Sequence, residues 1–265
     1  MVQARLSGTK IGVGALIALT LATGVATVVN LQSGEAASGP TATATSPTET
    51  EQLSPAAAYV IELIQDRHVG TSTVVREQTL ADVLPNHLFS VAGSEPVALA
   101  AGTVIGTVSS VEPGAAYVSS AESNAGDEVA FDSTDAEWRV VIVTIAVDSA
   151  VGEVTGDSTV RLGIAVDGAA DIATAIEGYQ QLGRVIVVLD AKGTFELDSS
   201  LYSARQGGAL FGLVADDGSI TFPAQGDNNA AFLDGLNTVT DVLSEATGPD
   251  VISEVERAGA ATSQD

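Results

Sequence analysis

Carboxylates are the most abundant reactive side chains in this sequence, and they are concentrated in one segment. Asp127, Glu128, Asp132 and Asp135 lie within residues 115–137. Ca²⁺ binds several hard oxygen ligands, and one acidic segment can supply them. The spacing does not match an EF-hand, however, and acidic residues occur along the whole chain. The segment therefore predicts either a Ca²⁺ site or, as the favoured interpretation, a solvated acidic loop.

A second candidate site combines a cation with an aromatic ring. Arg205 and Gln206 lie in a glycine-containing loop, and Trp138 is the only Trp of the chain. A loop arginine can bind an anionic group of a ligand, but pairing with a neighbouring carboxylate is the more common outcome. Trp138 opens an apolar segment, which favours a place in the core. Arg205, Gln206 and Trp138 are the candidate ligand-binding residues.

The motifs that usually indicate catalysis are incomplete. His68 and His87 are the only histidines, and neither has the paired-histidine pattern of a zinc site. Each is therefore expected to be a surface or capping residue. Gly156-Asp157-Ser158 matches part of a protease nucleophile segment, but Thr159-Val160 follow where that motif has glycines, so we interpret it as a turn. We expect a non-enzymatic protein with no catalytic residue and no cofactor other than Ca²⁺.

Composition excludes one class of partner. The chain has 34 acidic and 10 basic residues, which gives a formal net charge of -24. Nucleic acid and anionic lipid are polyanions, so they would be repelled by this charge. The chain also has no cysteine, and disulfides, thiolate metal sites and cysteine nucleophiles are excluded with it.

The N-terminal segment predicts export. Residues 11–29 are uncharged, Arg5 and Lys10 precede them, and acidic residues follow from Glu35. At about 1.5 Å per residue this run would span roughly 28 Å as a helix, close to the thickness of a bilayer core. We therefore expect a single-pass membrane anchor in residues 1–31. Secretion after signal cleavage near Gly34-Glu35-Ala36 is the alternative.

The segment from Trp138 to Asp148 is expected to position these candidate residues. It is rich in β-branched residues and lacks Gly and Pro, so it predicts a strand. Side chains alternate between the two faces of a strand, and both faces of this one are apolar. Protein is therefore expected to cover both faces, as in the middle of a sandwich or a small barrel.

The order of the predicted elements indicates the fold. Strands are expected at residues 97–111, 138–148, 159–166 and 185–189, a helix at 171–182, and a hairpin at 210–222 around Asp216-Asp217-Gly218. The motif Glu112-Pro113-Gly114 is expected to end the first strand. Three strands, a helix and closing strands are the order of an OB-like barrel, so we expect a mainly β chain with a few helices and a small closed β-barrel of about five to six strands, the helix lying between strands 3 and 4. A β-sandwich is the alternative, although the helix counts against it.

The chain is therefore expected to have five parts. Residues 1–31 form the export segment, 32–52 a Ser/Thr/Pro linker, 53–95 a helical lead-in, 96–223 the barrel-like domain, and 224–265 an amphipathic helix with a weaker helical piece at 251–257 and a loose tail. The leading functional hypothesis is a domain held outside the membrane that binds an envelope protein or a cell-wall component. The alternative is a secreted, Ca²⁺-dependent binding domain that uses residues 115–137.

Overall fold

The structure is a computed structural model, and it describes residues 53–66, 79–91, 94–120, 126–192 and 200–255. Every described residue belongs to the unit Glu49–Asp265. The predicted export segment, the linker and His68 lie outside the described residues. Within the described ranges, no helix is both long enough and apolar enough to cross a membrane.

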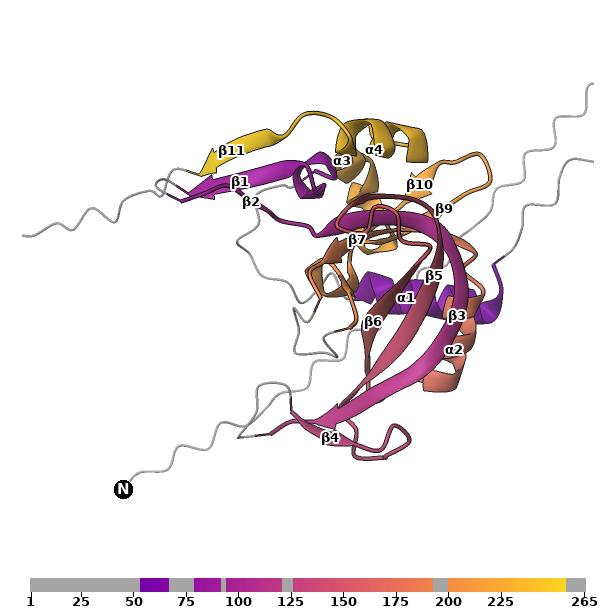
Figure 1. Ribbon diagram of the computed structural model, residues 1–265. Helices are drawn as coiled ribbons and strands as arrows, with labels where there is room; N and C mark the ends of the chain where they lie inside the picture. Colours follow the sequence, from indigo (N-terminus) through magenta and orange to yellow (C-terminus); the bar gives the residue numbers. More distant parts are fainter. Residues whose placement is uncertain (1–52, 67–78, 92–93, 121–125, 193–199, 256–265) are drawn as a thin grey trace, which may run out of the picture. The chain divides into compact units, whose positions relative to one another are not determined.

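The described chain is mainly β with a few helices, as the sequence predicts (Figure 1). An eight-stranded sheet has the order β10-β9-β7-β3-β5-β6, with β4 paired to β3 and β8 paired to β7. Its strands are β3 (Gly102–Val118), β4 (Asp127–Val129), β5 (Trp138–Gly152), β6 (Thr159–Asp167), β7 (Arg184–Asp190), β8 (Ser203–Ala204), β9 (Phe211–Val214) and β10 (Ile220–Thr221).

A second, three-stranded sheet has the order β11-β1-β2. Its strands are β1 (His87–Val91), β2 (Val97–Ala98) and β11 (Val251–Val255). The α-helices are α1 (Pro55–Asp66), α2 (Ile172–Gln180), α3 (Asn229–Leu233) and α4 (Val239–Ala246), and the 3-10 helices are η2 (Ala81–Val83), η3 (Gln206–Gly208) and η4 (Pro223–Asn228).

The predicted central strand is β5, and it pairs with β3 on one side and β6 on the other. Val141, Val143 and Ile145 are buried, because they point into the main hydrophobic cluster. On the opposite face, Ile142 and Thr144 are only partly buried. The prediction that protein covers both faces of this strand is therefore wrong for part of the second face: Val140 there is only 2% exposed, but solvent reaches Ile142 and Thr144.

The strand predicted at 97–111 is wrong at both ends: Val97–Ala98 form β2 of the three-stranded sheet, and β3 begins only at Gly102 and continues through Pro113-Gly114 to Val118. The pairing with β5 shifts register between Pro113 and Ala116, and such a bulge tolerates a residue that lacks a backbone N–H. A Cβ on Gly114 would lie 2.8 Å from the carbonyl oxygen of Val140, so this close approach requires glycine. The predicted loop at 115–137 is thus partly a hairpin, in which β3 pairs with β4.

Strand β7 confirms the predicted buried strand and divides the core into two clusters. Its alternate residues Val185, Val187 and Leu189 belong to a cluster that α1 and α2 cover. Ile186 and Val188 belong to a second cluster that includes residues of η2, α3 and α4. The hairpin of β9 and β10 is also confirmed.

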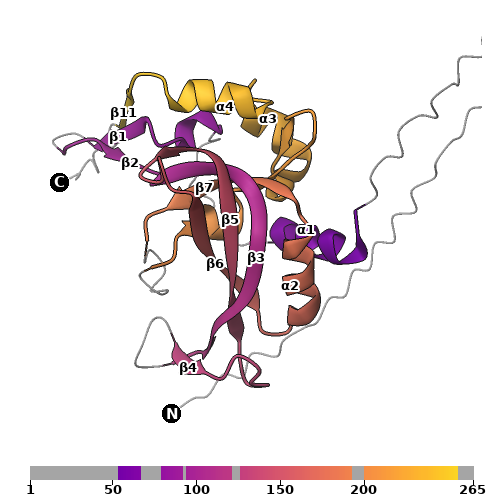
Figure 2. The same cartoon turned by 45° about the vertical axis from the view of Figure 1, so that its right-hand side comes forward.

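Helix α2 begins where the sequence predicts, because Asp171 caps it. The Oδ1 atom of Asp171 accepts a hydrogen bond from the backbone N–H of Thr174 at 3.2 Å. The helix packs on α1 at Gly178, where a Cβ would lie 2.1 Å from the carbonyl oxygen of Ala56. Figures 1 and 2 both show α1 and α2 side by side.

The C-terminal part corrects two predictions. The single amphipathic helix is broken into α3 and α4, because Asp234 and Gly235 adopt positive φ values of 44° and 92°. The helical piece expected at 251–257 is wrong over Val251–Val255, which form β11 in parallel pairing with β1. Strand β1 itself lies in the lead-in that was expected to be helical.

The strand ladders of the described residues do not form a closed barrel. One parallel bridge, between Leu162 and Tyr202, connects β6 to the residue before β8. Two backbone hydrogen bonds support it, from Gly163 N–H to Tyr202 O at 2.8 Å and from Tyr202 N–H to Arg161 O at 3.1 Å.

Candidate functional site

The half-exposed face of β5 carries an aromatic pair at one end. Tyr117 of β3 and Trp138 of β5 are register partners, and their rings stack with centroids 4.2 Å apart and an angle of 17° between their planes. Both side chains are partly exposed. Aromatic rings at a water-accessible surface offer a large apolar contact area together with a polar atom.

The rest of this face is mostly polar or small, apart from Ile142 and Val140, and Val140 is buried. Partners in an antiparallel ladder share a face, so Ala165 and Gly163 of β6 lie on the same face as Trp138. An ion pair crosses β5, with Arg161 Nη2 2.8 Å from Glu112 Oε1 and both side chains exposed. We call this surface the outer face, and it comprises Glu112, Tyr117, Trp138, Ile142, Thr144, Arg161, Gly163 and Ala165.

Arg139 fixes the turn beside the aromatic pair. Its buried guanidinium donates hydrogen bonds to three backbone carbonyls, those of Phe131 at 2.8 Å, Ser133 at 2.8 Å and Gly168 at 2.6 Å. A buried arginine is normally matched by acceptors, and here the turn supplies them. The segment before Trp138 is therefore an ordered support for the outer face, a role that the sequence did not indicate.

The structure does not gather the predicted Ca²⁺ ligands. Asp127 and Glu128 are consecutive in β4, so their side chains point to opposite faces. Asp132 and Asp135 lie in the turn beyond β4 and are exposed. In the described ranges, no three His, Cys, Asp or Glu residues are placed to hold a metal ion together.

The structure places Arg205 in a buried ion pair. Its Nη1 atom lies 2.7 Å from Asp190 Oδ1 and also donates to the carbonyl oxygen of Leu99. The side chains of Arg205 and Asp190 are 18% and 11% exposed. Burial raises the pKa of Asp190, while the charge and hydrogen bond of Arg205 lower it in part. The expectation of pairing with local acid is thus met.

Arg205 and Gln206 lie far along the sheet from Trp138. Gly102 pairs with Leu189 of β7 and with Gly152 at the end of β5, whereas Trp138 is the first residue of β5. Gln206 has a positive φ of 57° and begins η3. The three candidate ligand-binding residues therefore do not form one site.

Beside this ion pair, buried polar atoms remain without a partner. Arg205 Nε, Ser203 Oγ and Thr103 Oγ1 accept or donate no hydrogen bond within the described chain. Such atoms are costly when buried, and an ordered water is a common partner for them. Ser203 is the register partner of Asp190 and Arg205 is its ion-pair partner, so their two unpartnered atoms border the buried pair.

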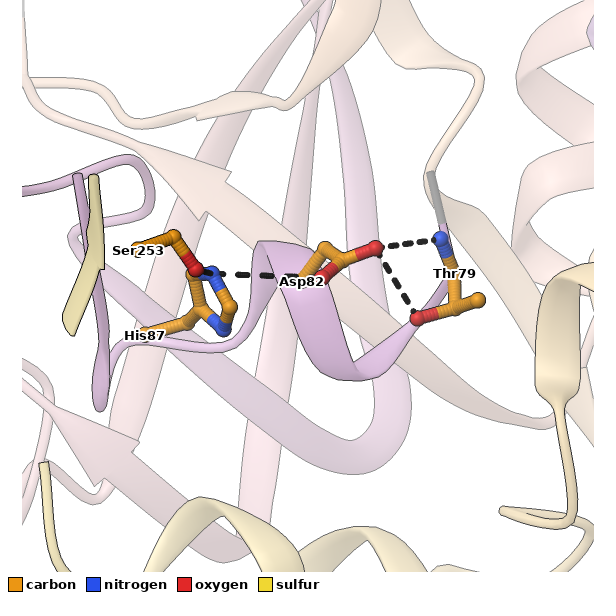
Figure 3. Close-up of polar contacts among 4 residues, drawn as sticks. All are labelled: Thr79, Asp82, His87 and Ser253. Carbon is orange, nitrogen blue, oxygen red and sulfur yellow. Dashed lines mark hydrogen bonds and ion pairs between the residues drawn. The ribbon is translucent and has the colours of Figure 1, made fainter. Parts of the chain in front are cut away.

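A further polar group joins β1 to β11 (Figure 3). Ser253 Oγ lies 2.9 Å from His87 Nε2, and Asp82 Oδ1 lies 3.9 Å from the same nitrogen. Asp82 Oδ2 in turn accepts hydrogen bonds from Thr79. His87 is 7% exposed, so the surface position expected for it is wrong.

The residue types of this group are those of a Ser-His-Asp relay, but its geometry is different. In such a relay the serine and the carboxylate bind different imidazole nitrogens, so that the proton taken from serine is balanced at the far side of the ring. Here both approach Nε2. The arrangement therefore serves as a polar clasp between η2, β1 and β11.

Comparisons with models of known protein families, with curated proteins and with solved structures give no match.

Proposed function

We propose that this protein is a non-enzymatic binding module, exported and held outside the cell membrane, that recognises an envelope protein or a cell-wall component with its outer face. The observation that carries the proposal is the stacked Tyr117–Trp138 pair on the half-exposed face of the central strand. An apolar central strand with one open face is suited to contact with a partner.

The chemistry of the outer face favours a neutral or hydroxyl-rich ligand. The aromatic pair offers an apolar contact surface, and Thr144 offers a hydroxyl. Arg161 is already matched by Glu112 at 2.8 Å, and the chain carries a net charge of -24. A polyanion is therefore disfavoured, and wall glycan is the component that fits this surface best.

We also propose that the large sheet curls into an OB-like barrel, in which Tyr202 and β8 complete the circle between β6 and β7. Three features support this: β8 pairs with β7, the Leu162–Tyr202 bridge reaches β6, and α2 lies between β6 and β7 in the chain. The outer face would then be the surface of the barrel's first three strands, β3, β5 and β6.

The proposed location depends on residues 1–31. The expectation is that the intact protein stays with the membrane fraction and that its β domain is accessible to protease added to whole cells. Recovery of the protein from the medium, starting near Ala37, would replace the anchor with a cleaved signal.

The binding proposal is tested by capture from solubilised envelopes and on isolated wall. Wild-type protein should retain the partner, and Trp138→Ala and Tyr117→Ala should each lose most of it, because each removes half of the stack. Leu53→Ala is the matched control, since Leu53 is an exposed apolar residue outside the outer face. Equal retention by all four proteins would refute the proposal.

The alternative, a secreted domain that binds Ca²⁺ through residues 115–137, has a separate test. A ligand that binds only the native state must raise the unfolding temperature. Because the described carboxylates diverge, we expect no rise when Ca²⁺ is added to the metal-free protein. A rise that is lost in Asp127→Asn or Asp132→Asn would favour the alternative.

A further inference from the structure

The three-stranded sheet carries an unusual share of exposed apolar side chains. The large hydrophobic residues exposed in the described chain are Leu53, Val97, Val251 and Ile252. Three of these four lie on this sheet, with exposed fractions of 60%, 44% and 55% for Val97, Val251 and Ile252. Val97 and Val251 lie on one face of the sheet and Ile252 on the other. Exposed apolar residues concentrated on one small sheet indicate an interaction surface more often than a chance feature.

Neither face of this sheet belongs to the core. Register partners share a face, so His87, Phe89, Val97 and Val251 lie on one side, and Leu88, Ala98 and Ile252 lie on the other. None of these residues belongs to either hydrophobic cluster of the described chain. The exception to this lack of cover is His87, which is 7% exposed and lies against Asp82 of η2. A small sheet with so little cover has limited stability of its own, and another strand or face would stabilise it.

Strand β11 offers an open edge. Within the described residues it pairs only with β1. The backbone N–H of Val251 points to β1 and donates to Asn86 O at 3.1 Å. Because backbone groups alternate in direction along a strand, those of Ile252 point outward, where an added strand could bind them.

The polar clasp holds this edge in place. Ser253 is bonded to His87 at 2.9 Å, and His87 lies against Asp82 of η2, as Figure 3 shows. The edge is thus extended before any partner arrives. A pre-ordered edge costs a partner less entropy than one that must fold on binding.

The charges around the sheet indicate the chemistry of the partner. Glu95 precedes β2 and Asp250 precedes β11, and both are exposed. The strands β1, β2 and β11 contain no Lys or Arg. A second copy of this chain would bring the same acidic residues, so charge complementarity favours a basic partner.

We propose that the edge of β11 is a docking site for an extended segment of another protein, with alternating apolar residues flanked by Lys or Arg, which adds a strand to the sheet. Main-chain hydrogen bonds to β11 would supply affinity, and contact with Val251, Ile252 and the acidic flanks would supply specificity. This site is separate from the outer face and does not depend on the function proposed for it.

The test uses the full-length protein and a fluorescein-labelled peptide of alternating Val and Thr between pairs of Lys, followed by fluorescence anisotropy. Wild type should bind it, and added salt should weaken binding because the flanking contacts are charged. Ile252→Pro removes an outward N–H and should weaken binding by about tenfold or more. Ile252→Val keeps the backbone and the apolar contact and should bind as wild type does.

Two control peptides complete the experiment. Replacing the flanking Lys with Glu, or the central Val with Pro, should each reduce affinity by about tenfold or more. Absence of binding by the Lys-flanked peptide, or equal binding by wild type and Ile252→Pro, would overturn the proposal. A dimer in sedimentation that is lost in Ile252→Pro would assign the edge to a second copy and would overturn it as well.

Discussion

Replacing Arg205 by alanine is expected to destabilise the domain by about 3 kcal/mol. Breaking a buried ion pair costs about 3–5 kcal/mol, because one charge is left buried without its partner. The pair here is 2.7 Å long and its side chains are 18% and 11% exposed, so the lower end of the range applies. The carbonyl oxygen of Leu99 also loses its donor.

The loss should depend on pH in a defined direction. Burial raises the pKa of Asp190, and Arg205 opposes this in part. In Arg205→Ala only burial acts on the pKa of Asp190 and raises it. Between the ordinary and the raised pKa, the Asp190 carboxyl is therefore protonated in the folded state and ionised in the unfolded state. The free energy of unfolding of this variant should therefore fall as pH rises from the ordinary pKa of Asp to the raised one, and the deficit should be largest above that window.

Urea denaturation at several pH values, followed by Trp138 fluorescence, measures both effects. The double variant Asp190→Asn with Arg205→Met should recover much of the lost stability, since it removes the unmatched charge. Arg161→Ala is the matched control, because the pair of Arg161 with Glu112 is exposed and should contribute less than about 1 kcal/mol. A deficit in Arg205→Ala that is no larger than that of Arg161→Ala, or that does not change with pH, would refute the reasoning.

Three further substitutions test the supports of the fold. Arg139→Met should cost about 3 kcal/mol in urea denaturation, because it removes three hydrogen bonds from a buried, charged donor to partly buried carbonyls. Gly178→Ala should cost about 1–3 kcal/mol in the same assay, since its Cβ would meet the carbonyl oxygen of Ala56. Gly183→Ala is the control for backbone strain alone, because a Cβ there meets no atom within 4 Å but the residue has a positive φ of 68°. Asp171→Ala should lower the melting temperature at neutral pH; hydrogen bonds from Thr174 lower the pKa of Asp171, so the difference from wild type should shrink as pH falls through that lowered value.

The elements that the sequence predicts correctly are those whose own residues are sufficient to specify their secondary structure. β5, β6 and β7 are rich in Val and Ile, α2 has a capping aspartate and a glycine stop, and Asp217-Gly218 marks the hairpin. Local preferences and the final contacts agree in these elements, so short-range reasoning is sufficient.

The missed elements depend on distant contacts. β3 continues past Pro113-Gly114 only because β5 provides a partner across a bulge. β11 is a strand only because β1, far away in the sequence, pairs with it in parallel. No local pattern at residues 251–255 distinguishes that outcome from a short helix.

The candidate site was predicted in part. Trp138 was named as a candidate ligand-binding residue, but a place in the core was favoured for it, because the sequence does not show that part of one face of β5 stays open. Its partner Tyr117 was missed, since it follows a motif that usually ends a strand. The apolar residues Ala116 and Val118 on either side of Tyr117 follow the alternation of a strand, and this was the available signal that the strand continues. The structure buries Ala116.

The fluorescence of Trp138, the only Trp of the chain, tests binding at the outer face most directly. The full-length protein is titrated with soluble fragments of cell-wall glycan and, in parallel, with fractionated envelope proteins. A ligand that covers the Tyr117–Trp138 stack should change the emission in a saturable manner, and Tyr117→Ala should weaken that response by about tenfold or more. If a partner captured by the protein binds without changing the emission of Trp138, and binds Tyr117→Ala equally well, the outer face is not the binding surface.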